Sequence, residues 1–457
     1  MNQNNFTQGK ILGPLLRFAL PVLFALFLQA MYGGVDLLIV GQFASARDVS
    51  AVSTGSQIMQ SITGVITGLA MGVTVLIGQK IGEDKPDEAG NAVGAGICLF
   101  MVIGIAVTVV MTAFASPVAR MMQAPEEAFD QTVAYVRICS AGTVFIIAYN
   151  VIGSVFRGMG NSKMPLITVA IACAVNIAGD ILLVAVFRMG AAGAAWATVF
   201  AQGVSVLLSG LIIKRLPGPF PFTRKNIRFH KESIWGVLKL GSPIALQDAL
   251  VSVSFLVILA IVNSLGLVAS AGVGVAEKIC AFIMLVPVAF SQSMSAFVAQ
   301  NVGAGRYDRA RKALFSGVGA SLLAGAAMFY LSFFHGDILC GLFARDAQVI
   351  AAGADYLKAY AIDTIFVSFL FCFSGYFNGC GRTFFVMAQG VAGAFLVRIP
   401  FSYLMSRTAG ATLFQVGLAT PASTLLQISL CAGYYLIFQR RLRKQGLLAL
   451  DEPRIAL

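Results

Sequence analysis

The segment KRLPGPFPFTRKNIRFHKESI, residues 214–234, decides how this 457-residue chain is organised. It is the one long stretch that is rich in both proline and basic residues, and apolar runs fill the sequence on either side of it. A helix that crosses a membrane needs about 20 apolar residues. We expect six spans on each side, which gives an N-terminal lobe 1–213, a cytoplasmic linker 214–234, and a C-terminal lobe 235–457 with a short cytoplasmic tail.

The composition excludes most classes of soluble protein. Hydrophobic residues make up 58% of the chain and charged residues 11%, with a mean hydropathy of +0.84, whereas a soluble domain is roughly 25% charged. A soluble enzyme, a disordered protein and a nucleic-acid binder are therefore excluded. The predicted fold is an all-α polytopic membrane protein with twelve spans, at 15–41, 50–79, 93–115, 133–156, 165–187, 191–213, 235–264, 269–299, 313–335, 351–378, 384–406 and 411–439.

The basic residues alternate between the two sides of the predicted membrane. If the chain begins inside, 21 Lys and Arg residues fall in cytoplasmic segments and 5 in outer loops, out of a total of 32. Cytoplasmic loops of membrane proteins carry such an excess of Lys and Arg. Both termini are therefore expected in the cytoplasm, and the net charge of +12 reflects this topology, not nucleic-acid binding.

The two halves of the sequence resemble each other. At an offset of 221 residues, Gln79, Gly82 and Asp87 match Gln300, Gly303 and Asp308, and at an offset of 222 Pro21 matches Pro243. Repeats of six spans enter the membrane from the same side, so they are parallel repeats. Transporters built from such repeats bind substrate between the halves and alternate by rocking one against the other.

Four polar residues of the first half are predicted to reach one depth in the membrane. Asn176 and Asp180 are four residues apart on one helical face, while Asp36 and Thr198 reach a similar depth on the first and sixth spans. Two carboxylates at one depth repel each other unless a proton or cation neutralises them. A hydrogen-bonded packing cluster is the alternative, but this repulsion favours a coupling-ion site for H⁺ or Na⁺ at these four residues.

The second half lacks this set of residues. Val397 and Phe401 align with Asn176 and Asp180, and Ile258 aligns with Asp36. Other charged residues instead lie near mid-membrane in this half, and they form either a charge-compensated network or part of a substrate site: Asp248, Asp363 and Arg398. Glu277 receives no assigned role.

Several motifs, taken together, resemble the multidrug and toxic compound extrusion (MATE) family over the whole chain. They are LQAMYGGVDLLIVGQ (28–42), RGMGNSKMP (157–165), VNIAGD (175–180), GAAGAAWAT (190–198), AQNVGAGRYDRAR (299–311) and VRIP (397–400). The chain is most similar to the DinF-like branch. The resemblance implies a V-shaped fold with a central cleft, in a bacterial cytoplasmic membrane.

The resemblance also implies antiport of drugs or toxic organic compounds against H⁺ or Na⁺, with no other cofactor. The family's cation site maps onto Asp36, Asn176, Asp180 and Thr198, and its substrate contacts map onto Gln29, Tyr32 and Asn150. Asp248 and Arg398 are further candidates for the substrate cleft. The expected substrates are small, amphipathic organic cations, and the protein is expected to act as a monomer within the lipid bilayer.

Two other functions remain open at this stage. A flippase or exporter of lipid-linked or amphipathic metabolites is the alternative within transport. An intramembrane enzyme is disfavoured, because the two histidines, His230 and His335, fall in loops and the sequence has neither an HExxH nor a GxSxG motif.

Overall fold

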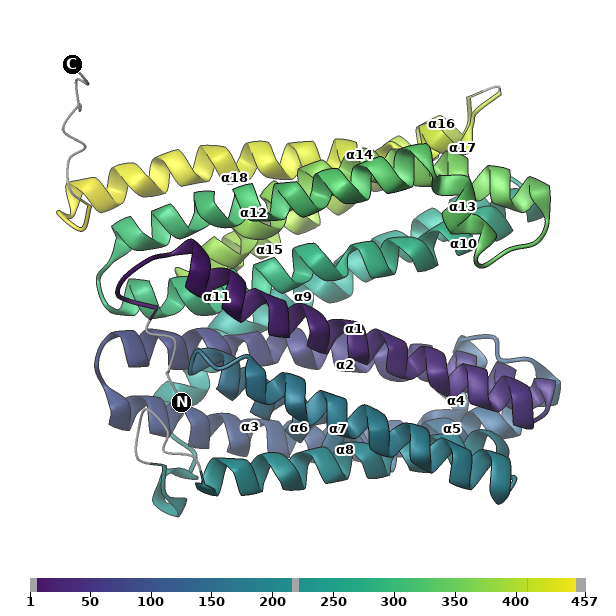
Figure 1. The fold of residues 1–457 in the computed structure, drawn as a ribbon, viewed down its shortest axis with the longest axis horizontal. Helices are drawn as coiled ribbons and strands as arrows, with labels where there is room; N and C mark the ends of the chain where they lie inside the picture. Colours follow the sequence, from purple (N-terminus) through teal and green to yellow (C-terminus); the bar gives the residue numbers. More distant parts are fainter. Residues whose placement is uncertain (1–5, 216–221, 409, 449–457) are drawn as a thin grey trace. The chain divides into compact units, whose positions relative to one another are not determined.

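The computed structural model describes residues 6–215, 222–408 and 410–448, and within these residues it is helical throughout, with no strand (Figure 1). Part of the predicted linker, residues 216–221, lies outside the described residues, and its remainder holds the short 3₁₀ helix η3 (Arg224–Asn226). The all-α prediction is confirmed.

The helices match the predicted spans closely. In the first half they are α1 (Leu12–Phe43), α2 (Ala46–Gly82), α3 (Pro86–Ala113), α4 (Ala115–Met121), η1 (Glu126–Ala128), α5 (Phe129–Ala141), α6 (Thr143–Gly158), α7 (Lys163–Asp180), η2 (Ile181–Val186) and α8 (Gly190–Arg215). In the second half they are α9 (Lys231–Asn263), α10 (Leu267–Ile283), α11 (Leu285–Gly303), α12 (Tyr307–Phe334), α13 (Gly336–Gly341), α14 (Ala347–Gly379), α15 (Thr383–Ala392), η4 (Gly393–Arg398), α16 (Ile399–Ser406), α17 (Leu413–Gly417) and α18 (Ala419–Lys444).

Among the described residues, eleven spans are long and apolar enough to cross a membrane, and a twelfth forms if η1–α5 and α6 count together. These two pieces meet at a bend of 52° beside Gly142. A Cβ atom at Gly142 would lie 2.4 Å from Val199 of α8, so glycine lets α8 pack directly against the bend. The span predicted at 133–156 therefore consists of two helices that meet at this bend.

The chain forms two compact units whose bounds differ from the two sequence halves. We call Leu20–Ala245 the N unit, and the described residues up to Ala19 together with those from Leu246 onward the C unit. Both α1 and α9 change unit within two residues of an internal proline, Pro21 or Pro243. The predicted lobes 1–213 and 235–457 describe the repeat, but each unit also contains a helix segment from the other half.

Close packing explains these exchanged segments. In the C unit, the fully buried ring of Phe6 packs against Phe18 and Phe297, with centroids 5.2 and 4.8 Å away. In the N unit, a Cβ atom on Gly72 of α2 would lie 2.5 Å from the backbone oxygen of Val237 in α9. Each exchanged segment is thus part of the core of the unit that it joins.

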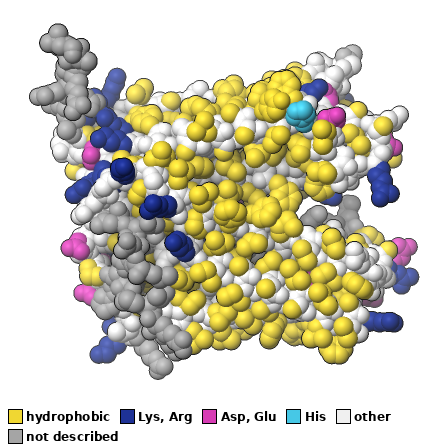
Figure 2. Space-filling view, viewed as in Figure 1, with side chains coloured by type: hydrophobic (Ala, Val, Ile, Leu, Met, Phe, Trp, Pro, Cys, Tyr) yellow, Lys and Arg dark blue, Asp and Glu magenta, His cyan; other side chains and the backbone are white. Residues whose placement is uncertain are grey.

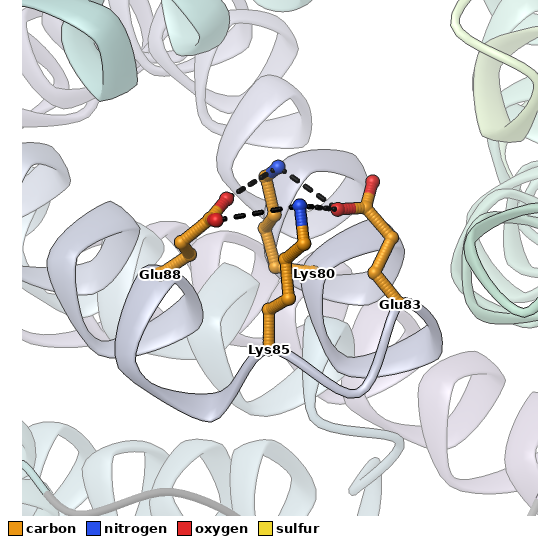
Figure 3. Close-up of polar contacts among 4 residues, drawn as sticks. All are labelled: Lys80, Glu83, Lys85 and Glu88. Atoms are coloured by element: carbon orange, nitrogen blue, oxygen red, sulfur yellow. Dashed lines mark hydrogen bonds and ion pairs between the residues drawn. The ribbon is translucent and has the colours of Figure 1, made fainter.

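The turns that follow α2 and α11 occupy equivalent positions in the repeat but are stabilised differently. In the N unit, Lys80 and Lys85 form ion pairs with Glu83 and Glu88, at 2.7 to 3.4 Å (Figure 3). Lys85 is exposed, and hydrogen bonds to Glu83 and Glu88 raise its pKa. This turn is held by its own side chains.

In the C unit, three side chains of the α11–α12 turn hold the segment before α1 instead. They are Asn301, Arg306 and Arg309, at an offset of 221 residues from Lys80, Lys85 and Glu88. Arg309 donates hydrogen bonds to the carbonyl oxygens of Phe6, Gln8 and Gly9, at 2.7 to 3.2 Å. Asn301 donates to Phe6 and Arg306 to Thr7. The segment 6–9 is therefore docked on this turn.

Hydrophobic side chains cover the middle of the face shown in Figure 2, and Lys and Arg gather toward the helix ends. Many of the exposed side chains are large and apolar, among them Phe200 and Leu323. A soluble protein rarely exposes so much contiguous apolar surface. The chain is an integral membrane protein, as predicted.

Candidate ion-coupling site

The structure brings the four predicted polar residues together inside the N unit. α1 carries Asp36, α7 carries Asn176 and Asp180, and α8 carries Thr198. Asp36 is 4% exposed, and Asn176 and Asp180 are fully buried. The structure thus brings together the four residues that helical spacing and span depth predicted to lie near one another.

The contacts in this cluster centre on Asp36. The hydroxyl of Thr198 donates a 3.3 Å hydrogen bond to Oδ2 of Asp36. Asn176 and Asp180 lie close enough to act electrostatically on the Asp36 carboxyl group, but none of their side-chain polar atoms forms a hydrogen bond with it. The two carboxyl groups therefore share one small region of the interior.

Most polar atoms of this cluster lack a hydrogen-bond partner within the described part of the chain. They are Oδ1 of Asp36, both side-chain polar atoms of Asn176, and both carboxyl oxygens of Asp180. Burying such groups without partners costs several kcal/mol or shifts their protonation. No Lys or Arg among the described residues forms an ion pair with either aspartate. The site can therefore accept a proton or a small cation.

The backbone around Asp180 is irregular. The α-helix α7 ends at Asp180, and the π-helical turn η2 begins at the next residue. A Cβ atom on Gly179 would lie only 3.0 Å from the Cβ atom of Ala197, so this glycine allows α7 and α8 to approach closely. Single π-helical turns occur frequently at functional sites, and this one adjoins the buried carboxyl group.

Two further residues belong to the surroundings of this cluster. Tyr32, predicted as a substrate contact, donates a 3.5 Å hydrogen bond from its hydroxyl to the carbonyl oxygen of Thr198. Gln202, which the sequence analysis did not single out, lies near the same hydroxyl, and its Oε1 has no hydrogen-bond partner among the described residues. Its position one turn after Thr198 was the available signal.

The other predicted cleft residues lie in different surroundings. Gln29 on α1 and Asp248 on α9 are exposed. Asn150 on α6 is buried, donates to the carbonyl oxygen of Ile146 and accepts a 3.3 Å hydrogen bond from Thr67. Asn150 thus connects α6 to α2 inside the N unit.

Arg398 lies buried in the C unit, at the end of the π-helical segment η4. Its guanidinium group donates a 3.2 Å hydrogen bond to Ser254 and lies 4.5 Å from the ring centroid of Phe255. Its charge also acts on the buried carboxyl group of Asp363, although the two form no ion pair. The C unit therefore provides a positive charge near its buried carboxyl group.

The comparison with protein families gives two matches along this chain. The MatE family model matches residues 21–182 and 243–404. The second match begins 222 residues after the first, which confirms the internal repeat and its offset. Together the two matches cover well over half of the chain.

Similar proteins are described as multidrug transporters. The probable multidrug resistance protein YpnP of Bacillus subtilis (strain 168) is 28% identical over 436 residues, covering 95% of this chain and 96% of YpnP. The multidrug export protein MepA of Staphylococcus haemolyticus (strain JCSC1435) is 21% identical over 411 residues, covering 89% of this chain and 90% of MepA.

Solved structures share the fold at low sequence identity. A crystal structure of MATE in complex with MaL6 has a TM-score of 0.90 and 18% identity, and covers 97% of this chain and 100% of that one. An outward-facing multidrug resistance MATE family transporter also has a TM-score of 0.90 at 18% identity, covering 97% and 99% of the two chains. The family match, the relatives and the shared fold agree with the resemblance in the motifs: the chain belongs to the MatE family of multidrug and toxic compound extrusion transporters.

Proposed function

We propose that the protein is an antiporter that exports drugs or toxic organic compounds in exchange for H⁺ or Na⁺. Membership of the MatE family and the multidrug exporters among the relatives support export of small organic compounds. The buried carboxyl groups of Asp36 and Asp180 carry the proposal of ion coupling, because no described basic residue is paired with either of them.

A positive ion would neutralise the repulsion between the two buried carboxyl groups of this cluster. Two neighbouring carboxylates cannot both stay charged in a buried site at low cost. A proton neutralises one of them, whereas Na⁺ would use both carboxylates together with the neutral oxygens of Asn176 and Thr198. Hard cations are bound by oxygen ligands of these kinds. Either ion would therefore satisfy polar atoms that have no partner within the described residues.

The α1 helix connects ion binding to a change of conformation. Asp36 lies in its second half, while Pro21 lies near the point where α1 changes unit. Sharp bends in helices occur at proline. Binding of the ion from outside neutralises the cluster, which lets α1 bend or repack and release the substrate. Release of the ion on the cytoplasmic side then restores binding of the next substrate, which is alternating access.

The substrates are amphipathic organic cations in this proposal. The exposed side chains of Gln29 and Asp248 provide an amide and a carboxylate for such molecules, each within its own unit. The protein acts as a monomer in a bacterial cytoplasmic membrane, with both termini in the cytoplasm, as the distribution of basic residues predicts.

Transport in proteoliposomes tests the proposal. A fluorescent cationic drug is loaded, and an inward H⁺ gradient or an inward Na⁺ gradient is imposed separately. We expect drug movement with one gradient and its loss in Asp36→Asn and Asp180→Asn. Asp130→Asn, a substitution of the same kind at an exposed residue, is the matched control. If both buried-site variants keep gradient-driven transport, the coupling site is wrong.

The same proteoliposomes distinguish the alternative function. A flippase would move a fluorescent lipid-linked substrate between leaflets, and this movement would not require the ion gradient that drives drug transport. Drug transport without lipid movement supports the antiporter. Lipid movement without drug transport would show that the protein is a flippase and not an antiporter.

A further inference from the structure

A basic surface pocket of about 800 Å³ lies in the C unit, apart from the candidate coupling site. The beginning of α12 and the end of α18 form its walls, and Ile11 completes them just before α1. Its cationic lining comes from both helices and comprises Arg311, Lys312, Arg440 and Arg443. The pocket belongs to a single compact unit.

The described lining of this pocket carries charge of one sign. It includes four basic side chains, and no Asp or Glu among the residues that the structure describes. Lys312 and Arg440 are exposed, and Figure 2 shows Lys and Arg gathered at the end of the molecule where α12 begins and α18 ends. Like charges around a common space repel each other, so an anion in the pocket would stabilise Lys312 and Arg440.

Apolar side chains adjoin the basic ones on the side toward the middle of the span. Phe315 and Leu436 line the pocket and are 57% and 59% exposed. The Phe315 ring packs edge-on against Tyr435, with centroids 6.0 Å apart. Tyrosine is enriched where the bilayer meets water, and Tyr435 also lines the pocket. The pocket therefore suits a ligand with an anionic head and an apolar tail.

Gln439 indicates which chemical group the ligand's headgroup should carry. It lines the pocket, is buried, and donates a 3.1 Å hydrogen bond from Nε2 to the hydroxyl of Tyr376. Its Oε1 has no partner among the residues that the structure describes. A carbonyl oxygen accepts hydrogen bonds, so a ligand with a hydroxyl group would satisfy it. An ionised phosphodiester alone provides no such donor.

We propose that this pocket binds the headgroup of phosphatidylglycerol from the leaflet that faces the cytoplasm. The phosphate lies among the basic side chains of α12 and α18, a glycerol hydroxyl donates to Gln439, and the acyl chains follow Phe315 and Leu436 into the bilayer. Basic pockets between membrane helices on the cytoplasmic side bind anionic lipid headgroups in this way. The pocket is independent of the proposed ion site.

Native mass spectrometry of the delipidated full chain tests this proposal. Phosphatidylglycerol and phosphatidylethanolamine with the same acyl chains are titrated separately. We expect phosphatidylglycerol to bind more tightly, and the double variant Lys312→Gln/Arg440→Gln to lose roughly tenfold or more of that affinity. Arg441→Gln/Lys444→Gln removes the same charge from exposed residues of α18 that do not line the pocket, and serves as the control.

Three results would overturn the proposal. The first is equal binding of the two lipids, and the second is an equal loss of affinity in the control variant. The third is binding of soluble glycerophosphoglycerol as tightly as the lipid, which would assign the pocket to a free anion. Gln439→Met tests the hydroxyl contact, because it should abolish any preference for phosphatidylglycerol over phosphatidylmethanol, a phosphodiester of the same charge that has no headgroup hydroxyl. A preference that survives unchanged contradicts that contact.

Discussion

The N unit and the C unit each bury a carboxyl-bearing cluster beside a π-helical turn, but their charges differ. In the N unit, Asp36 and Asp180 adjoin η2 without a basic partner among the described residues. In the C unit, Arg398 ends η4 and acts on Asp363. The C unit carries a covalently attached cation near its buried carboxyl group, whereas no described Lys or Arg forms an ion pair with the two buried aspartates of the N unit. This difference favours the N unit as the place of ion coupling.

The largest expected effect comes from the N-unit carboxyl groups. Asp180→Asn leaves Asp36 without a neighbouring carboxylate, which removes the repulsion within the cluster and one of its two anionic ligands for a cation. Gradient-driven efflux should fall to the passive leak, while the melting temperature of the purified protein should stay equal or rise. Thermal unfolding and transport measured on one preparation separate these effects. Lost transport together with a large drop in melting temperature would indicate a structural role instead.

Removal of the C-unit cation should have the opposite effect on stability. Arg398→Gln leaves the buried Asp363 without a nearby positive charge, and breaking a buried charge arrangement in this way costs on the order of 3 kcal/mol. We expect a lower melting temperature, with most of it restored by the double variant Arg398→Gln/Asp363→Asn. If the double variant is no more stable than Arg398→Gln, the two groups do not compensate each other.

The docking of segment 6–9 should contribute less to the stability of the protein than the Arg398 charge does. Arg309→Gln removes the three hydrogen bonds from its guanidinium group to backbone carbonyl oxygens, each with a net contribution of about 1 kcal/mol. Limited proteolysis should then cut the N-terminus faster, with a modest decrease in melting temperature. Arg306→Gln removes one such bond from the same turn. It should therefore change the rate of proteolysis and the melting temperature less than Arg309→Gln does. Equal effects of the two variants would contradict this ranking.

The smallest effect is expected at the equivalent turn of the N unit. Lys85→Gln removes exposed ion pairs, which contribute little to stability. Because the pKa of Lys85 is raised by its glutamate partners, any contribution is complete below the ordinary lysine pKa near 10.4 and declines only above it. The melting temperatures of wild type and variant should coincide from about pH 6 to 9. A difference that changes within this range would contradict the assignment.

Much of the architecture follows from local patterns in the sequence. Apolar runs of sufficient length predicted the spans, and the family match bears out the repeat that the loop residues indicated. The Asn176–Asp180 spacing, together with span depth, predicted the cluster with Asp36. These inferences succeed because helix geometry relates sequence spacing directly to position.

Features that depend on tertiary contacts could not be predicted from sequence spacing. The bend beside Gly142 depends on its packing with Val199 of a distant helix. The docking of Phe6 depends on Phe297 and on the α11–α12 turn. Gln202 was overlooked although its spacing from Thr198 was visible, because a single amide in a span gives a weak signal beside two carboxylates.

The exchange of helix segments makes each half of the polypeptide a structural component of the other. The interior of the C unit contains Phe6, Leu15 and Phe18, which are encoded hundreds of residues before the rest of that interior, and the N unit contains Val237 from beyond the linker. Neither half-chain can complete its own hydrophobic core alone. Fragments produced by cleavage between residues 213 and 231 should accordingly remain associated through detergent purification, as though the backbone were intact.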